Sequence, residues 1–262
     1  MSLLQTEGLT RRYAGLVAVD AVTLAVPQGG VHAVIGPNGA GKTTFFNMLS
    51  GLVPPSEGTM RFAGQDITRG KAHRRAALGM ARTFQNIRVF TEMTVLENVL
   101  TGLHAGMACG LAGVVLRLSG FRRAERAAVV ASRAALEAVG LADRADALSG
   151  SLSYGDQRRL EIARAMVAKP RLLLLDEPAA GMNPAETESL AGLVRRIADG
   201  GTTVLLVEHD MGFVMGLSDS VSVLNFGRLI YSGTPAQARS EPAVVEAYLG
   251  ARLAEKLRAR HG

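Results

Sequence analysis

The chain carries the stretch Gly36-Pro37-Asn38-Gly39-Ala40-Gly41-Lys42-Thr43-Thr44, which has the form G-x-x-x-x-G-K-[ST]. The apolar run 31–35 before it predicts a buried strand, and residues 45–50 after it predict a helix. Glycines let successive backbone N–H groups turn inward, and the start of the helix adds its positive dipole end. A glycine-rich turn without function would not need this flanking strand and helix. We therefore predict that all nine residues bind nucleotide phosphates, with the Lys42 ammonium on the β- and γ-phosphates and the Thr43 hydroxyl on Mg²⁺.

The composition is that of a globular protein. Its 262 residues fit one large α/β domain, or a core domain with a smaller insertion. Residues 1–7 lack the basic-then-apolar layout of a signal peptide. The most apolar run, 108–118, has about half the length needed to span a bilayer. We therefore expect that the chain neither crosses nor enters a membrane by itself.

Charge and cysteine content narrow the location and the partners. Cys109 is the only cysteine, which excludes a disulfide framework and makes the cytosol the default location. The net charge of +6 would suit nucleic acid, but it would equally suit an anionic membrane surface. The basic residues are scattered over helical segments, and the chain has no Trp for base stacking. Charge alone does not decide between nucleic acid and a membrane surface as partner. Because the basic residues are scattered and Trp is absent, we expect no nucleic-acid partner.

Hydrophobic periodicity divides the chain into three regions around the phosphate loop. Residues 3–26, with a polar interruption at 10–15, and the hairpin at 59–65 predict a small antiparallel β subdomain. Helical spacing dominates from about 90 to 160, with a glycine-interrupted connection at 102–120, and predicts an inserted helical subdomain. The remainder predicts a parallel-sheet core: strands at 81–85, 171–178 and 203–209, helices at 71–79, 157–169, 184–198, 235–239 and 241–249, and a hairpin at 221–231, before a basic tail at 251–262.

Two acids end the apolar strand predicted at 171–178. Asp176 closes the aliphatic run, where a carboxylate can reach Mg²⁺ on bound phosphates. Glu177 follows directly and is a candidate general base for the attacking water. The alternative is an acidic pair that only ends a strand and caps the next helix. Behind a phosphate loop, we favour the catalytic interpretation.

The stretch Leu152-Ser153-Tyr154-Gly155-Asp156-Gln157 resembles the signature loop L-S-G-G-Q of the ATP-binding-cassette (ABC) ATPases. By itself it predicts an ordinary helix N-cap, although a Ser and a Gly at a helix start also form an anion site. The resemblance implies that Ser153 and Gly155 complete the ATP site of a partner subunit in a head-to-tail dimer. Tyr154 replaces the usual first glycine, and Asp156 with Gln157 replaces the usual single Gln.

The same resemblance assigns roles to three more residues. It places Gln85 on Mg²⁺ or the attacking water, His209 on the γ-phosphate, and the Tyr13 ring on adenine. The competing interpretations are a polar strand end, a structural histidine and a partly buried core tyrosine. The chain departs from the family pattern at 179–183, because Asn183 stands where T-S-A-L-D has its aspartate.

Four stretches, at 82–85, 93–98, 154–164 and 178–184, are similar to the Liv-type ATP-binding subunits. The resemblance implies a P-loop NTPase fold and ATP hydrolysis that drives a bacterial branched-chain amino-acid importer. It also implies a second, non-identical ATPase subunit, two permease subunits and a periplasmic binding protein, with this chain peripheral at the cytoplasmic face of the inner membrane. The alternatives are a urea, amide or lipid-export transporter, a soluble ABC ATPase that acts without a transporter, and a P-loop kinase or GTPase.

Overall fold

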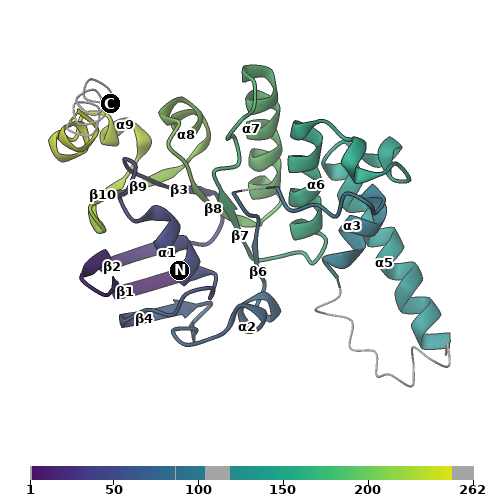
Figure 1. Cartoon of the computed structure of the whole chain (residues 1–262), viewed down its shortest axis with the longest axis horizontal. Helices are drawn as coiled ribbons and strands as arrows, with labels where there is room; N and C mark the ends of the chain where they lie inside the picture. Colours follow the sequence, from purple (N-terminus) through teal and green to yellow (C-terminus); the bar gives the residue numbers. More distant parts are fainter. Residues whose placement is uncertain (1, 86, 104–118, 250–262) are drawn as a thin grey trace.

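The computed structural model describes residues 2–85, 87–103 and 119–249. The predicted basic tail at 251–262 and most of the connection predicted at 102–120 lie outside these residues. Two sheets and a group of helices make up the described chain (Figure 1). The α/β fold class predicted from the sequence, a parallel-sheet core with an antiparallel β subdomain and an inserted helical part, is confirmed.

The larger sheet has six strands and carries the phosphate loop. Their order is β10 (Arg228–Gly233), β9 (Ser220–Asn225), β3 (Val31–Ile35), β8 (Thr203–Val207), β7 (Leu172–Asp176) and β6 (Met80–Arg82). All neighbours pair in parallel except β10, which is antiparallel to β9. Both faces of the central strands are buried, which explains their continuous apolar sequences. Along β7, Leu173 and Leu175 join one core cluster while Leu172 and Leu174 join the other.

The smaller sheet is antiparallel and packs with helix α1 on one of these clusters. Its order is β2 (Leu16–Pro27), β1 (Ser2–Tyr13), β4 (Glu57–Phe62) and β5 (Gln65–Asp66). The polar interruption predicted at 10–15 is wrong in extent, because β1 continues to Tyr13 and only residues 14–15 turn. The polar side chains there are tolerated because they are half-buried or exposed on the strand, apart from Thr10, whose hydroxyl is hydrogen-bonded.

Helices cover both faces and one end of the larger sheet. They are α1 (Lys42–Leu49), α2 (Ala72–Ala77), α3 (Val95–Thr101), α5 (Ser119–Ala138), α6 (Tyr154–Met166), α7 (Pro184–Asp199), α8 (Met211–Leu217), α9 (Pro235–Ala238) and a last one at 242–249. Helices α3, α5 and α6 pack together at the end of the molecule away from the small sheet (Figure 1). Helix α8 was not predicted; Asp210 caps it by accepting hydrogen bonds from the amides of Gly212 and Phe213. None of the helices in the described part has both the length and the apolar character needed to cross a bilayer.

Candidate nucleotide site

The site lies where parallel strands end and loops begin. The carboxyl ends of β3, β6, β7 and β8 share one edge of the sheet. The chain leaves these ends toward Gly36, Gln85, Glu177 and His209, respectively. Open α/β sheets bind ligands at this edge. Topology therefore gathers residues that are up to 173 positions apart in the sequence, 209 minus 36.

The phosphate loop depends on three glycines with positive φ. Gly36, Gly39 and Gly41 have φ values of 151°, 80° and 95°. A Cβ on Gly36 would stand 2.1 Å from the Leu224 carbonyl oxygen, and one on Gly41 would stand 2.3 Å from that of Ala18. A Cβ on Gly39 would meet no atom within 4 Å. Two glycines thus let the loop pack on the protein, while the third faces open space where a ligand can approach.

A hollow of about 380 Å³ lies beside this loop. It is lined by loop and neighbouring residues: Leu16, Val17, Ala18, Asn38, Gly39, Ala40, Gly41, Lys42, Thr43, Thr44, Glu177, Phe226 and Gly227. The two hydroxyls, the ammonium and the carboxylate stand beside apolar side chains from β2 and the β9–β10 turn. The hollow therefore offers a polar part for phosphates and an apolar part for a base or sugar.

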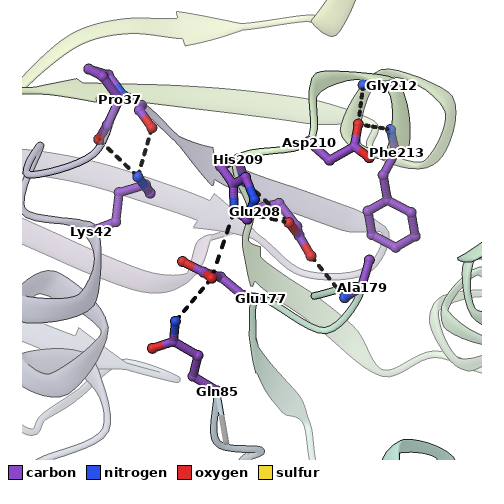
Figure 2. A network of polar contacts seen from close by, with 11 residues as sticks. Pro37, Lys42, Gln85, Glu177, Ala179, Glu208, His209, Asp210, Gly212 and Phe213 are labelled. Atoms are coloured by element: carbon purple, nitrogen blue, oxygen red, sulfur yellow. Dashed lines mark hydrogen bonds and ion pairs between the residues drawn. The ribbon is translucent and has the colours of Figure 1, made fainter. Parts of the chain in front are cut away.

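Lys42 is buried at the floor of the loop. Its Nζ donates hydrogen bonds to the carbonyl oxygens of Gly36, at 2.7 Å, and Pro37, at 3.0 Å (Figure 2). Burial lowers the pKa of the Lys42 ammonium, and the field of the nearby carboxylates, Glu177 first, opposes this shift. The loop thus holds a buried Lys42 ammonium, which anionic groups such as phosphates would stabilise.

Asp176 is 2% exposed and forms an ion pair that the sequence did not reveal. Its Oδ2 lies 2.7 Å from an Nη of Arg82 on the neighbouring strand β6. The same guanidinium donates to the Ser50 hydroxyl, at 2.6 Å, at the end of α1. The other carboxylate oxygen, Asp176 Oδ1, is buried and has no hydrogen-bond partner among the residues that the structure describes. A buried carboxylate oxygen of this kind calls for a cation or a donor.

Glu177, Gln85 and His209 meet in one cluster (Figure 2). The Gln85 side-chain amide donates to Glu177 Oε2 at 3.1 Å, and His209 Nδ1 lies 3.7 Å from the same oxygen. Glu177 has a φ of 44°, a left-handed backbone held by its amide, which donates to the Val207 carbonyl at 2.9 Å. Glu177 also lines the hollow beside the phosphate loop. Gln85 was predicted as a strand end; that is wrong, because β6 stops at Arg82 and Gln85 stands on the following loop.

Glu208 binds two backbone amides beside this cluster, and no role was predicted for it from the sequence. It is 1% exposed, and its Oε1 accepts a hydrogen bond from the Ala179 amide at 3.0 Å. Its Oε2 accepts one from the His209 amide at 3.2 Å. Burial raises the pKa of the Glu208 carboxyl, and these two hydrogen bonds oppose the shift. Its position in the sequence, directly after a buried strand and before His209, could have indicated that it belongs to the site.

Ser153 and Gly155 lie apart from the hollow. Ser153 caps α6, because its hydroxyl accepts a hydrogen bond from the Asp156 amide at 3.2 Å. Gly155 is buried, and a Cβ there would come within 3.0 Å of Glu186 Oε1 on α7. Neither residue lines the phosphate hollow of its own chain.

Tyr13 does not line the hollow either. It stands at the end of β1, 40% exposed, with the Arg11 guanidinium 4.5 Å above its ring. The ring is accessible for stacking, so its role on adenine stays a prediction. Leu16 and Phe226 line the hollow and were not predicted. Phe226 is 84% exposed, and its φ of 45° belongs to the tight turn that it forms with Gly227 between β9 and β10.

The donor set fits Mg²⁺. Mg²⁺ takes oxygen ligands, usually one or two from the protein together with phosphates and waters. Asp176 Oδ1 is a buried carboxylate oxygen to which no described residue donates, and Thr43 lines the adjoining hollow. Gln85 contributes a further amide oxygen on the loop that contacts Glu177. These three residues would hold the ion.

A phosphate loop after β3, an acid-ended β7 and a signature loop that opens α6 define an ABC-type cassette. Residues 19–180 match the family described as ABC transporter. The chain therefore belongs to the ABC transporter family. Residues 228–254 also match a family described as branched-chain amino acid ATP-binding cassette transporter.

Individual relatives agree with this assignment. The chain is 46% identical over 249 residues to the high-affinity branched-chain amino acid transport ATP-binding protein BraF of Pseudomonas aeruginosa, covering 95% of this chain and 98% of that protein. It is equally similar, with the same coverage, to LivG of Escherichia coli, which carries the same description. A crystal structure of the ADP conformation of an ATP-binding cassette from an ABC transporter superposes with a TM-score of 0.83, at 31% identity, over 95% of this chain and 99% of that one.

Proposed function

We propose that this chain is the ATP-hydrolysing subunit of an importer for branched-chain amino acids. The observation that carries the catalytic part is the cluster of Glu177, Gln85 and His209 beside the phosphate loop. A carboxylate, an amide and an imidazole at one point can accept a proton from water, orient that water and contact a terminal phosphate.

The roles of the chain's own residues follow from their positions. Lys42 exchanges its two loop carbonyls for the β- and γ-phosphates, and the amides of residues 36–44 surround them. Mg²⁺, when bound through Thr43, Asp176 and Gln85, neutralises charge on the phosphate oxygens. Glu177 accepts the proton of the attacking water, while Gln85 and His209 hold that water and the γ-phosphate in place. Tyr13 stacks on adenine.

The position of Ser153 and Gly155 supports a shared site. Ser153 is exposed and lies outside the hollow of its own chain, so it can contact the site of a second subunit, while Gly155 is buried behind it. ATP would then bridge two subunits that face each other head to tail, and its hydrolysis would release them. We propose that the second subunit is a non-identical paralogue, and that a helical subdomain spanning about residues 90–160 passes closure on to two permease subunits. A periplasmic binding protein would deliver the substrate, with this chain peripheral at the cytoplasmic face of the inner membrane.

The substrate class rests on the comparisons. BraF and LivG are described as branched-chain amino acid transport proteins, and they align with nearly the whole chain. The match at 228–254 belongs to a family with the same substrate in its description. No described residue of the candidate site recognises an amino acid, so specificity would reside in the membrane and binding-protein subunits.

The test is ATP hydrolysis and leucine uptake by the complete transporter in vesicles, with the wild-type chain and with Glu177→Gln. We expect the variant to bind ATP with unchanged affinity but to hydrolyse it about 100-fold more slowly at this site. Uptake of leucine, but not of urea, would depend on ATP. Unchanged hydrolysis in Glu177→Gln would remove the general-base assignment. Active hydrolysis without uptake of any branched-chain amino acid would refute the substrate class alone.

A further inference from the structure

A buried arginine on helix α6 holds the main chain of the segment that carries Gln85. Arg158 is fully buried, five positions after the helix cap Ser153. One of its Nη atoms donates to the Phe84 carbonyl at 2.7 Å, and the other donates to the Gln85 carbonyl at 2.8 Å. These carbonyls follow the end of β6, where the sheet ladder no longer holds the chain.

Glu161 completes this arrangement one turn further along α6. Its Oε2 accepts from Arg158 at 2.9 Å, and its Oε1 accepts from the Arg88 amide at 2.8 Å. Arg164 lies 3.6 Å from the same Oε1 and 5.7 Å from the centre of the Phe90 ring. One helix thus contacts the segment on both sides of Gln85 through buried, charge-assisted hydrogen bonds.

Burying the Arg158–Glu161 pair is costly, and packing alone does not require it, while Arg164 stays partly exposed at its edge. A well-packed apolar pair would often be equally stable. Such a network does fix the geometry of whatever it binds, because each bond has a defined direction. Here the groups held are the backbone carbonyls of Phe84 and Gln85 and the amide of Arg88, and the Gln85 side chain in turn donates to Glu177.

We propose that Arg158, oriented by Glu161, is a positioning residue that ties the placement of Gln85 against Glu177 to the placement of helix α6. The inference rests on the proposed function, in which Ser153 at the start of α6 contacts ATP bound to the partner subunit. A displacement of α6 on closure then moves the Phe84 and Gln85 carbonyls with it. Each site therefore senses whether the opposite site has closed.

The test compares a double variant, Arg158→Met with Glu161→Leu, with a matched control, Arg159→Met. The double variant removes both charges together, so that neither is left buried alone. Arg159 stands next in the helix but pairs with Asp156 and Ser189, away from the Gln85 segment. Hydrogen exchange of the isolated full-length chain at the Arg88 amide gives the structural readout. We expect fast exchange in the double variant and protection in the wild type and the control.

A cycle with Gln85→Ala in the assembled transporter gives the functional readout. We expect the double variant to lower kcat for ATP about tenfold and to change the KM little, since misplacement of a catalytic group acts mainly on the chemical step. In the Gln85→Ala background the same double variant should cause less than about a twofold further loss. A tenfold loss in both backgrounds would overturn the proposal, because the network would then act independently of Gln85.

Two further outcomes would also overturn the proposal: continued protection at Arg88 in the double variant, or an equal loss of kcat in Arg159→Met. Should the double variant fail to fold, Arg158→Lys replaces it, since a lysine retains the charge but cannot bind both carbonyls. Lysine should then reproduce the loss of kcat only when Gln85 is present. Failure of the proposed function would appear separately, as a wild-type complex that does not hydrolyse ATP.

Discussion

At the scale of single residues, the site depends on buried charges that are each bound by several partners. Arg82 joins the end of β7 to the end of α1, and Glu208 joins the loop after β7 to His209. The sequence did not reveal the contacts of either residue, because their partners Asp176 and Ala179 are 94 and 29 positions away. The phosphate-loop residues were predictable because a contiguous loop carries its own chemistry.

Arg82→Met should destabilise the protein by about 3 kcal/mol, because it leaves the Asp176 carboxylate buried without its cation. The double variant with Asp176→Asn should recover at least part of this loss, since no unpaired charge then remains. Urea denaturation of the wild type, both single variants and the double variant measures the coupling between the two positions. If the two losses simply add, the ion pair is not what stabilises this corner of the sheet.

Glu208 should make stability fall as pH rises. Burial raises the pKa of the Glu208 carboxyl in the folded state, so the folded chain holds a proton that the unfolded chain releases near the ordinary pKa of 4.5. The stabilising contribution is therefore complete below that value and is lost as pH rises through the folded-state pKa. The free energy of unfolding of the wild type minus that of Glu208→Gln should decrease between about pH 4 and pH 8. Glu161, whose pKa is also raised, cancels in this difference because both proteins contain it. A difference that rises with pH would contradict the assignment.

At the scale of elements, helix starts serve both the fold and the site. The Asn183 side-chain oxygen accepts a hydrogen bond from the Glu186 amide, and the Glu186 carboxylate accepts one from the Asn183 amide, which forms a capping box for α7. The sequence placed Asn183 where the family has an aspartate. A side-chain oxygen that accepts at an N-cap is common to both residues, so the departure leaves this capping function intact.

Asn183→Ala should therefore cost about 1 kcal/mol of stability, and Asn183→Asp should cost little. Thermal or urea unfolding measures both. Thr94→Ala removes the equivalent box at α3 and should cost a similar amount, which makes it a control remote from α7. A large loss with Asn183→Asp would show that the position needs the neutral amide for a reason other than capping.

Periodicity predicted most elements because each is long enough to show its pattern. The central strands were recognised from uninterrupted apolar runs, and α7 from its Pro at the first turn and the glycines after it. Strand ends were less accurate: Glu177 and His209 were assigned to strands that stop at Asp176 and Val207. These residues lie on turns because the carboxyl edge of the sheet forms the site. Helix α8 was not predicted, because two glycines within its seven residues weaken the helical pattern.

At the scale of the whole molecule, the separation of Ser153 from the phosphate hollow determines how the protein can work. In the proposed dimer, a chain that holds the phosphate loop at one place and the signature loop at another would contribute part of each of two sites. The sequence suggested this arrangement only through a family resemblance, because no local pattern reports the distance between two loops. In the structure Ser153 lies outside the hollow. The proposed dimer would place it at the site of the partner subunit.

The shared site makes a prediction about the assembled transporter. In a complex whose copies of this chain carry Glu177→Gln, the remaining hydrolysis comes from the partner's site, which Ser153 of this chain would complete. Adding Ser153→Ala should lower that remaining rate by about 100-fold, the effect of losing one donor to the transferring phosphate. Ser151→Ala is the matched control, because that hydroxyl lies two positions away and donates to the Leu148 carbonyl within its own turn. Since Ser153 also caps α6, unfolding of the variant must be measured, and a loss of about 1 kcal/mol is expected. An unchanged rate with Ser153→Ala in a folded complex would mean that the two subunits do not share their sites.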